Sequence, residues 1–232
     1  MPPGPRPGPR TLFSAARVVG QTESAADGEY TLALEGSGVF AVAEGVGRGV
    51  PADVAATASL RAIDRRLGGR RLDGPPAPRE AARLGLDAAN GEVWRLATAQ
   101  SAYPDMSASV GLLVLDSDRA AFLGTGGVRM LRWRDGRLGL LHGPVGNLRR
   151  RLGEAPEMNM RAVGLAMAPG DVYLLASQGL ERALSSVGEL TRALERGDPE
   201  QVIQQVTEIA REKGHEGRLA LVSVTVGGGS GA

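Results

Sequence analysis

The residues best placed for chemistry gather in a glycine-rich segment, Glu44 to Val50, which reads EGVGRGV. The segment follows an apolar run and precedes a stretch with helical spacing that Pro51 opens. Because backbone N–H groups at the start of a helix attract anions, such a segment could hold a phosphate. Its spacing matches neither GxGxxG nor GxxxxGK followed by Ser or Thr. Spacing alone therefore favours a tight turn between a strand and a helix.

The side chains that could bind a metal are mostly carboxylates. The chain has no Cys and two His, His142 and His215, which excludes disulfides, thiolate zinc sites and cysteine nucleophiles. Any metal would therefore need oxygen ligands. With 27 basic and 26 acidic side chains, the net charge of +1 gives no global field that would attract nucleic acid or an anionic membrane. We expect neither as a partner.

The composition indicates one globular domain. The chain has 232 residues, of which 42% are hydrophobic and 23% charged. We expect a disordered Pro/Gly/Arg arm at 1–10, a single domain at 11–226 and a flexible tail at 227–232. No run is apolar and long enough to cross a bilayer, and the N-terminus lacks the apolar centre of a signal peptide, so we expect a cytoplasmic protein.

The elements expected from periodicity and turn residues follow the order strands, two helices, many strands, helices, strand, which is typical of an α+β fold. A hairpin is expected at 30–43, a meander at 110–141, and a further strand pair at 160–176 around the turn APGD. The expected strands are 30–34, 39–43, 110–115, 120–123, 128–133, 138–141, 160–167, 172–176 and 219–226. The expected helices begin at Pro51 and end at Gly68, and span 79–100, 180–186 and 199–213.

Eight segments together resemble the type 2C metal-dependent (PPM) Ser/Thr protein phosphatases, from about residue 14 to 226. The segment VFAVAEGVGRGVPADVAA resembles the family's LFaVADGMGG stretch, MSASVGLLVL resembles MGTTLvall, and GDVYLLASQGL resembles GDxlLLcSDGL. The other matching segments, in chain order, are VVGQTES, AANGEV, AAFLGTGGVRMLRWRDGRL, NLRRRLG and GRLALVSVTV. The resemblance implies a four-layer α-β-β-α sandwich, with two central antiparallel sheets and helices on both outer faces.

The resemblance also implies where a two-metal centre would lie. The family holds two Mn²⁺ or Mg²⁺ ions with carboxylates and one glycine carbonyl, and they activate a water that attacks phosphorus. Matched to the family motifs, the metal-ligand positions fall on Ser24, Glu44, Gly45, Gln178 and Arg218. Glu23 matches the acidic residue that precedes the first of these ligands in the family. Aspartates are thus replaced by Ser24, a longer Glu44, a neutral Gln178 and a cationic Arg218.

The replacement by Arg218 argues most strongly against a metal. A unit-charge pair about 4 Å apart is worth about 4 kcal/mol at an effective dielectric of about 20, and here the pair is repulsive. The family's GDSR motif falls on 124–127, which reads GTGG, and its flap segment is very short here, between Leu141 and Asn147. The phosphate-contacting Arg falls on Val19, although Arg17 lies close in sequence.

These departures predict a catalytically inactive phosphatase-like domain without a metal, acting as a binding or regulatory module in bacterial Ser/Thr phosphorylation signalling. Its expected partner is a protein, such as a Ser/Thr kinase or a phosphoprotein. We expect Glu44 and Arg218 to form a salt bridge in the former cleft. A second interpretation gives Arg218 and Arg17 a phosphate-binding role.

A third interpretation is an active phosphatase that holds one Mn²⁺ or Mg²⁺ ion with an unusual set of ligands. Glu23 and Glu44 would bind the ion, together with Asp105 or Asp171. Asp171 and Asp105 are also explained as loop and turn residues.

Overall fold

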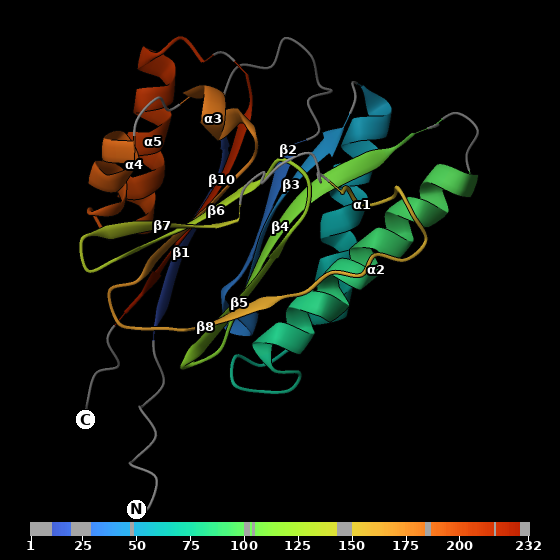
Figure 1. The fold of residues 1–232 in the computed structure, drawn as a ribbon, viewed down its shortest axis with the longest axis horizontal. Coiled ribbons are helices and arrows are strands. Elements are labelled where there is room, and N and C mark those ends of the chain that lie inside the picture. The colour runs from blue at the N-terminus through green and yellow to red at the C-terminus, as the bar shows by residue number, and fades with distance from the viewer. Residues whose placement is uncertain are drawn as a thin grey trace, which may run out of the picture.

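The computed structural model describes residues 11–19, 29–46, 49–99, 103, 105–142, 150–183, 187–215 and 217–227. Two five-stranded antiparallel sheets lie face to face, and helices cover the outer face of each (Figure 1). The predicted α+β sandwich of four layers is confirmed.

We name the two sheets A and B. Sheet A has the order β1-β10-β9-β6-β7 and sheet B the order β2-β3-β4-β5-β8. The strands of sheet A are β1 Leu12–Val19, β10 Leu219–Val226, β9 Val172–Ala176, β6 Arg129–Arg134 and β7 Arg137–His142. Those of sheet B are β2 Glu29–Leu34, β3 Val39–Val46, β4 Ser107–Leu115, β5 Arg119–Gly124 and β8 Val163–Ala166. A short 3-10 turn, Glu35–Ser37, links β2 to β3.

Two long helices, α1 (Val50–Leu67) and α2 (Pro78–Ala99), cover sheet B. Pro51 lies in the first turn of α1, where its missing N–H costs no hydrogen bond, and Gly68 ends the helix. Their apolar faces bury Ile63 and Leu86 against Leu112 of β4. The packing of α1 and α2 on sheet B therefore fixes where α1 begins relative to the end of β3.

The other outer layer consists of α3 (Gly179–Ala183), α4 (Val187–Leu194) and α5 (Pro199–Glu212). Asp198 caps α5 by accepting the N–H of Gln201 at 2.9 Å, and Pro199 occupies the first turn. The apolar face of α5 packs on the outer face of sheet A.

Both sheets contribute to a shared core between them, as predicted. Phe40 and Leu113 come from sheet B, and Tyr173, Leu175 and Val222 from sheet A; all five are almost fully buried. Burial of this size stabilises the sandwich by about 1.5–3 kcal/mol per large side chain.

Two predicted strand pairings are wrong. The segment 110–141 is not one meander, because β5 belongs to sheet B and β6 to sheet A. Likewise β8 pairs with β5 and β9 lies between β10 and β6, so the turn APGD crosses between sheets instead of closing a hairpin. Turn residues mark where the chain reverses but do not say which sheet it enters next. The sequence reasoning also missed β1 and α4.

The helix at 79–100 was predicted correctly but begins one residue earlier, and position 100 lies outside the described residues. The segments 1–10 and 228–232 also lie outside them, so the terminal arm and tail stay predictions. Within the described part of the chain, no helix is long and apolar enough to cross a membrane.

Candidate functional site

One end of the sandwich brings together residues from four separate segments. Glu29 begins β2 and Glu44 lies near the end of β3, and the antiparallel register places them opposite each other. Gln178 follows β9, and its backbone N–H donates to Glu44 Oε2 at 3.0 Å. Arg218 precedes β10 and donates from Nη2 to the backbone carbonyl of Glu29 at 3.1 Å. We call Glu29, Glu44, Gln178 and Arg218 the cleft cluster.

Three of the residues predicted from the sequence, Glu44, Gln178 and Arg218, therefore lie in the cleft cluster. The fourth residue, Glu29, was not singled out. A signal for it existed, because a hairpin with Glu44 on its second strand must place some residue of the first strand opposite. Counting back across the EGSG turn reaches Glu29.

Gly45 follows Glu44 and is held by packing against α1. A Cβ atom at this position would lie 1.8 Å from the carbonyl oxygen of Ala52 and 2.6 Å from its Cα. Backbone atoms cannot rotate away, so only glycine fits where the first turn of α1 crosses β3. Packing alone thus explains this glycine, without a role for its carbonyl in metal binding.

The carboxyl group of Glu29 is buried, with 5% of the residue exposed. One of its oxygens, Oε2, accepts hydrogen bonds from Ser177 Oγ and from the N–H of Ala220, each at 3.0 Å. Burial, followed by repulsion from Glu44, raises the pKa of Glu29 to about 7, although the two hydrogen bonds and Arg218 oppose the rise. The cleft cluster therefore holds a carboxyl group that is partly protonated near neutral pH.

Arg218 has a second contact, with the ring of Tyr30. Its guanidinium carbon lies 5.5 Å from the ring centroid, and the Tyr30 hydroxyl donates to Asp53 Oδ1 at 2.6 Å. That hydrogen bond, with some burial, raises the pKa of Tyr30. Arg218 is thus held by an aromatic face and a carbonyl oxygen.

The predicted salt bridge between Glu44 and Arg218 is wrong. No ion pair joins the two among the residues that the structure describes. Glu44 takes the N–H of Gln178 instead, while Arg218 points to the Glu29 carbonyl and Tyr30. Glu44 and Arg218 therefore each bind a different partner and do not contact each other through an ion pair.

The donor set of the cleft cluster does not fit two divalent cations. One oxygen of Glu44 accepts a backbone N–H, and Arg218 adds a positive charge. The Gln178 amide is neutral and packs on Gly127, where a Cβ would lie 2.6 Å from its Oε1. In the described part of the chain, no group of three or more His, Cys, Asp or Glu side chains is arranged to hold a metal. Two carboxylates beside a guanidinium cannot offset four positive charges.

Other predicted site residues lie elsewhere or outside the described residues. Glu23 and Ser24 are among the residues that the structure does not describe. Arg17 is 58% exposed and pairs with Glu200 of α5 at 2.7 Å, on the outer face of sheet A. The structure therefore does not bring Arg17 to the cleft cluster.

The two alternative metal ligands are also apart from the cluster. Asp171 is fully buried and accepts hydrogen bonds from Arg134, Tyr173 and the N–H of Ala168, so it is a structural carboxylate. Asp105 lies in a loop with a positive φ of 61° and lines a neighbouring pocket.

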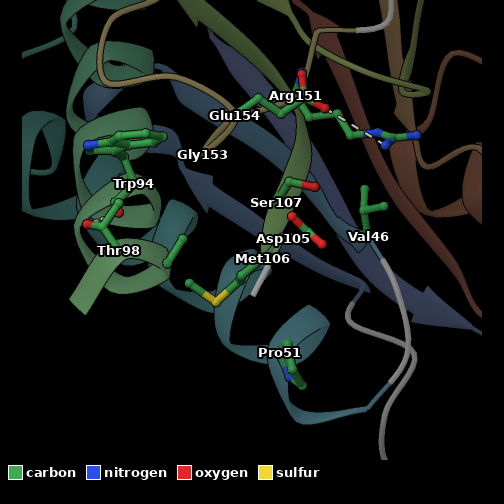
Figure 2. A pocket seen from close by; sticks show the side chains of 11 residues that line it. Val46, Pro51, Trp94, Thr98, Asp105, Met106, Ser107, Arg151, Gly153 and Glu154 are labelled. Carbon is green, nitrogen blue, oxygen red and sulfur yellow. Dashed lines mark hydrogen bonds and ion pairs between the residues drawn. The ribbon is translucent and has the colours of Figure 1, made fainter. Parts of the chain in front are cut away.

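That pocket adjoins the cleft cluster through the last residue pair of β3 and β4. Val46 pairs with Ser107, two positions beyond the pair Glu44–Ser109, and both Val46 and Ser107 line the pocket. Figure 2 shows Trp94 and Thr98 of α2 on one side, with Arg151 and Glu154 on the other. The volume is about 670 Å³, and the walls mix aromatic, charged and hydroxyl groups. A pocket of this size and mixture suits a peptide side chain or a small polar molecule.

Comparisons with known proteins define the class through the fold. No protein-family model matches the chain, and no curated protein sequence matches it. Solved structures do match, and the fold is that of the PPM-type Ser/Thr phosphatases.

Three of these structures cover nearly the whole chain. The Mycobacterium tuberculosis Ser/Thr phosphatase PstP/Ppp has a TM-score of 0.81 at 18% identity, over 93% of this chain and 99% of its own. The PstP catalytic domain in complex with two manganese ions has a TM-score of 0.82 at 19% identity, over 94% and 99%. PppA, a regulatory component of the Pseudomonas aeruginosa type VI secretion system, has a TM-score of 0.79 at 22% identity, over 94% and 99%.

Proposed function

We propose that the chain is a degenerate PPM phosphatase that has lost catalysis and acts as a binding or regulatory module in bacterial Ser/Thr phosphorylation signalling. The observation that carries the proposal is the hydrogen bonding of the cleft cluster. Glu44 accepts the N–H of Gln178 and Arg218 donates to the Glu29 carbonyl, so hydrogen bonds within the protein and one cation occupy positions that the resemblance assigns to metal ligands. This arrangement supports a site that works without a cofactor.

The charge of the cleft cluster supports this proposal. A guanidinium beside two carboxylates leaves one net negative charge, and protonation of Glu29 near neutral pH reduces it further. PstP, which shares the fold, binds two manganese ions, so the fold itself permits a metal centre. We therefore attribute the proposed loss of the metal centre to the side chains and not to the architecture.

The partner that we propose is a protein, either a Ser/Thr kinase or a phosphoprotein, met in the cytoplasm. The end of the sandwich that carries the cleft cluster and the adjoining pocket is the surface we assign to it. This surface has a concave site of about 670 Å³ with Trp94 and Arg151 in its walls. Aromatic and arginine side chains are enriched where protein interfaces concentrate their binding energy.

An active metal-dependent phosphatase is the second candidate, and the pairing of Glu29 with Glu44 favours it. Two carboxyl groups from opposite positions of one hairpin could bind a single Mn²⁺ or Mg²⁺ ion. Binding would have to ionise Glu29, whose pKa is raised, and overcome the positive charge of Arg218. Both requirements weaken the affinity, so we rank this candidate second.

The test is hydrolysis of p-nitrophenyl phosphate and of a phosphoserine peptide with Mn²⁺ or Mg²⁺. We expect the rate with the parent protein to equal that of buffer, with no effect of EDTA, because the cluster lacks ligands for the ions. An active PPM phosphatase in the same assay shows that the conditions permit turnover. Hydrolysis that EDTA abolishes, and that Glu44→Gln removes, would support the second candidate instead.

A further inference from the structure

The β6–β7 hairpin places three arginines on one face of sheet A, at elements other than those that carry the cleft cluster. Arg132 pairs with Gly139 and Arg134 pairs with Arg137, so the three arginine side chains lie on the same face of the hairpin. Gly139 also belongs to this face but has no side chain to cover it. A cavity of about 430 Å³ lies there. Its lining residues, which we call the hairpin pocket, are Arg132, Arg134, Asp135, Arg137, Leu138 and Gly139.

Arg134 is anchored and fixes the shape of the hairpin pocket. It forms an ion pair with Asp171, a carboxylate that is fully buried, and it donates to the carbonyl of Ala166 at 2.8 Å. Since Ala166 ends β8 of sheet B, Arg134 links the hairpin of sheet A to the opposite sheet. Its charge is neutralised by Asp171, so its role here is to position the hairpin.

Arg132 and Arg137 have no such partner. In the parts of the chain that the structure describes, neither guanidinium makes a hydrogen bond or an ion pair. They are diagonal neighbours across the two strands, close enough to contact one ligand together. Asp135, at the hairpin tip, is the acidic member of the lining and partly offsets their two charges.

We propose that the hairpin pocket binds the phosphoryl group of a phosphoserine or phosphothreonine in an extended segment of a partner protein. Each guanidinium can donate two parallel N–H bonds to phosphoryl oxygens, and Gly139 leaves the floor open. β7 is the outermost strand of sheet A, so its free edge can hydrogen-bond an extended segment that carries the phosphoryl group.

The inference does not depend on the cleft cluster, which lies at other elements of the fold. The full-length chain is titrated with a short phosphoserine peptide with alternating valines, with its unphosphorylated counterpart, and with inorganic phosphate. We expect the phosphopeptide to bind at least about tenfold more tightly than the unphosphorylated peptide, because two charge-assisted bidentate contacts are lost without the phosphoryl group. The double variant Arg132→Gln/Arg137→Gln should lose that preference.

Two control variants distinguish binding in the hairpin pocket from general attraction of the peptide to positive charge on the protein surface. Arg61→Gln removes an exposed arginine on α1 that forms no ion pair with any residue the structure describes, and it should leave the affinity unchanged. At Gly139, a Cβ would meet one atom, the Arg132 carbonyl oxygen, at an ordinary 3.7 Å. Gly139→Ala should therefore bind like the parent, whereas Gly139→Leu should fill the floor and lower the affinity about tenfold without changing charge.

Thermal melts confirm that each variant is folded before its affinity is read. Equal binding by parent, Gly139→Leu and the double arginine variant would overturn the proposal. Equal binding of the phosphorylated and unphosphorylated peptides would do so as well. If inorganic phosphate bound as tightly as the phosphopeptide, with the same dependence on the variants, the ligand would be a free anion and the proposed peptide partner would be wrong.

Discussion

Gly45→Ala is expected to destabilise the protein by at least about 3 kcal/mol, which is roughly a fifth or more of the free energy of unfolding of a typical domain. The reason is the 1.8 Å approach of its Cβ to the carbonyl oxygen of Ala52, with two more backbone atoms of that residue closer than 3 Å. Relief requires α1 to move away from β3, which opens the core around Ile63. Urea denaturation measures the loss.

The control for this substitution is Gly91→Ala in the middle of α2. A Cβ there meets no atom within 4 Å, and the position is helical, so alanine should stabilise by about 0.5–1 kcal/mol. If Gly45→Ala were as stable as the parent, the close packing of α1 on β3 would be wrong.

Glu29→Gln is expected to stabilise the protein at pH 8 by about 3 kcal/mol and to change little at pH 4. The folded-state pKa of Glu29 is about 7, above its ordinary value of 4.5, because of burial and then of Glu44. The folded state therefore binds the proton more tightly than the unfolded chain, so the parent loses stability as the pH rises from about 4.5 to 7. Glutamine removes that loss, and its carbonyl oxygen can still accept from Ser177 and Ala220.

Urea denaturation of both proteins across this pH range measures the difference. Glu195→Gln, an exposed surface change, is the matched control and should show no pH-dependent gain. A constant difference between Glu29→Gln and parent at all pH values would mean that Glu29 has the same pKa in the folded and unfolded states, which would contradict the raised pKa.

The layers of the fold follow from the sequence because burial dictates them. Strands such as 172–176 and 219–226 are mostly apolar on both faces, which requires cover on both faces and so two sheets with helices outside. The distribution of strands between sheets could not be predicted, since GTGG and APGD are turn signals that serve a crossing between sheets as well as a hairpin. β1 was missed because Ser14 and Arg17 interrupt its apolar pattern.

The candidate site was predictable in position and less so in its contacts. Motif resemblance placed Glu44, Gln178 and Arg218 near one another, because each lies at a strand end. It could not choose the partner of Arg218, since that depends on the distance to Tyr30 and to the Glu29 carbonyl. The unpaired arginines of the hairpin pocket could not be predicted either, because they depend on the register of β6 and β7. They also depend on Asp171, which the sequence indicates as a turn residue or a metal ligand but not as the partner of Arg134.

The central claim is that the cleft cluster has replaced a two-metal centre with hydrogen bonds of its own. Calorimetric titration of the EDTA-treated protein with Mn²⁺ tests it most directly, alongside the triple variant Glu44→Asp/Gln178→Asp/Arg218→Asp, which restores acidic side chains. We predict no saturable heat for the parent protein, and measurable Mn²⁺ binding by the triple variant if it folds. Saturable binding of two Mn²⁺ ions by the parent, lost on Glu44→Gln, would contradict the account.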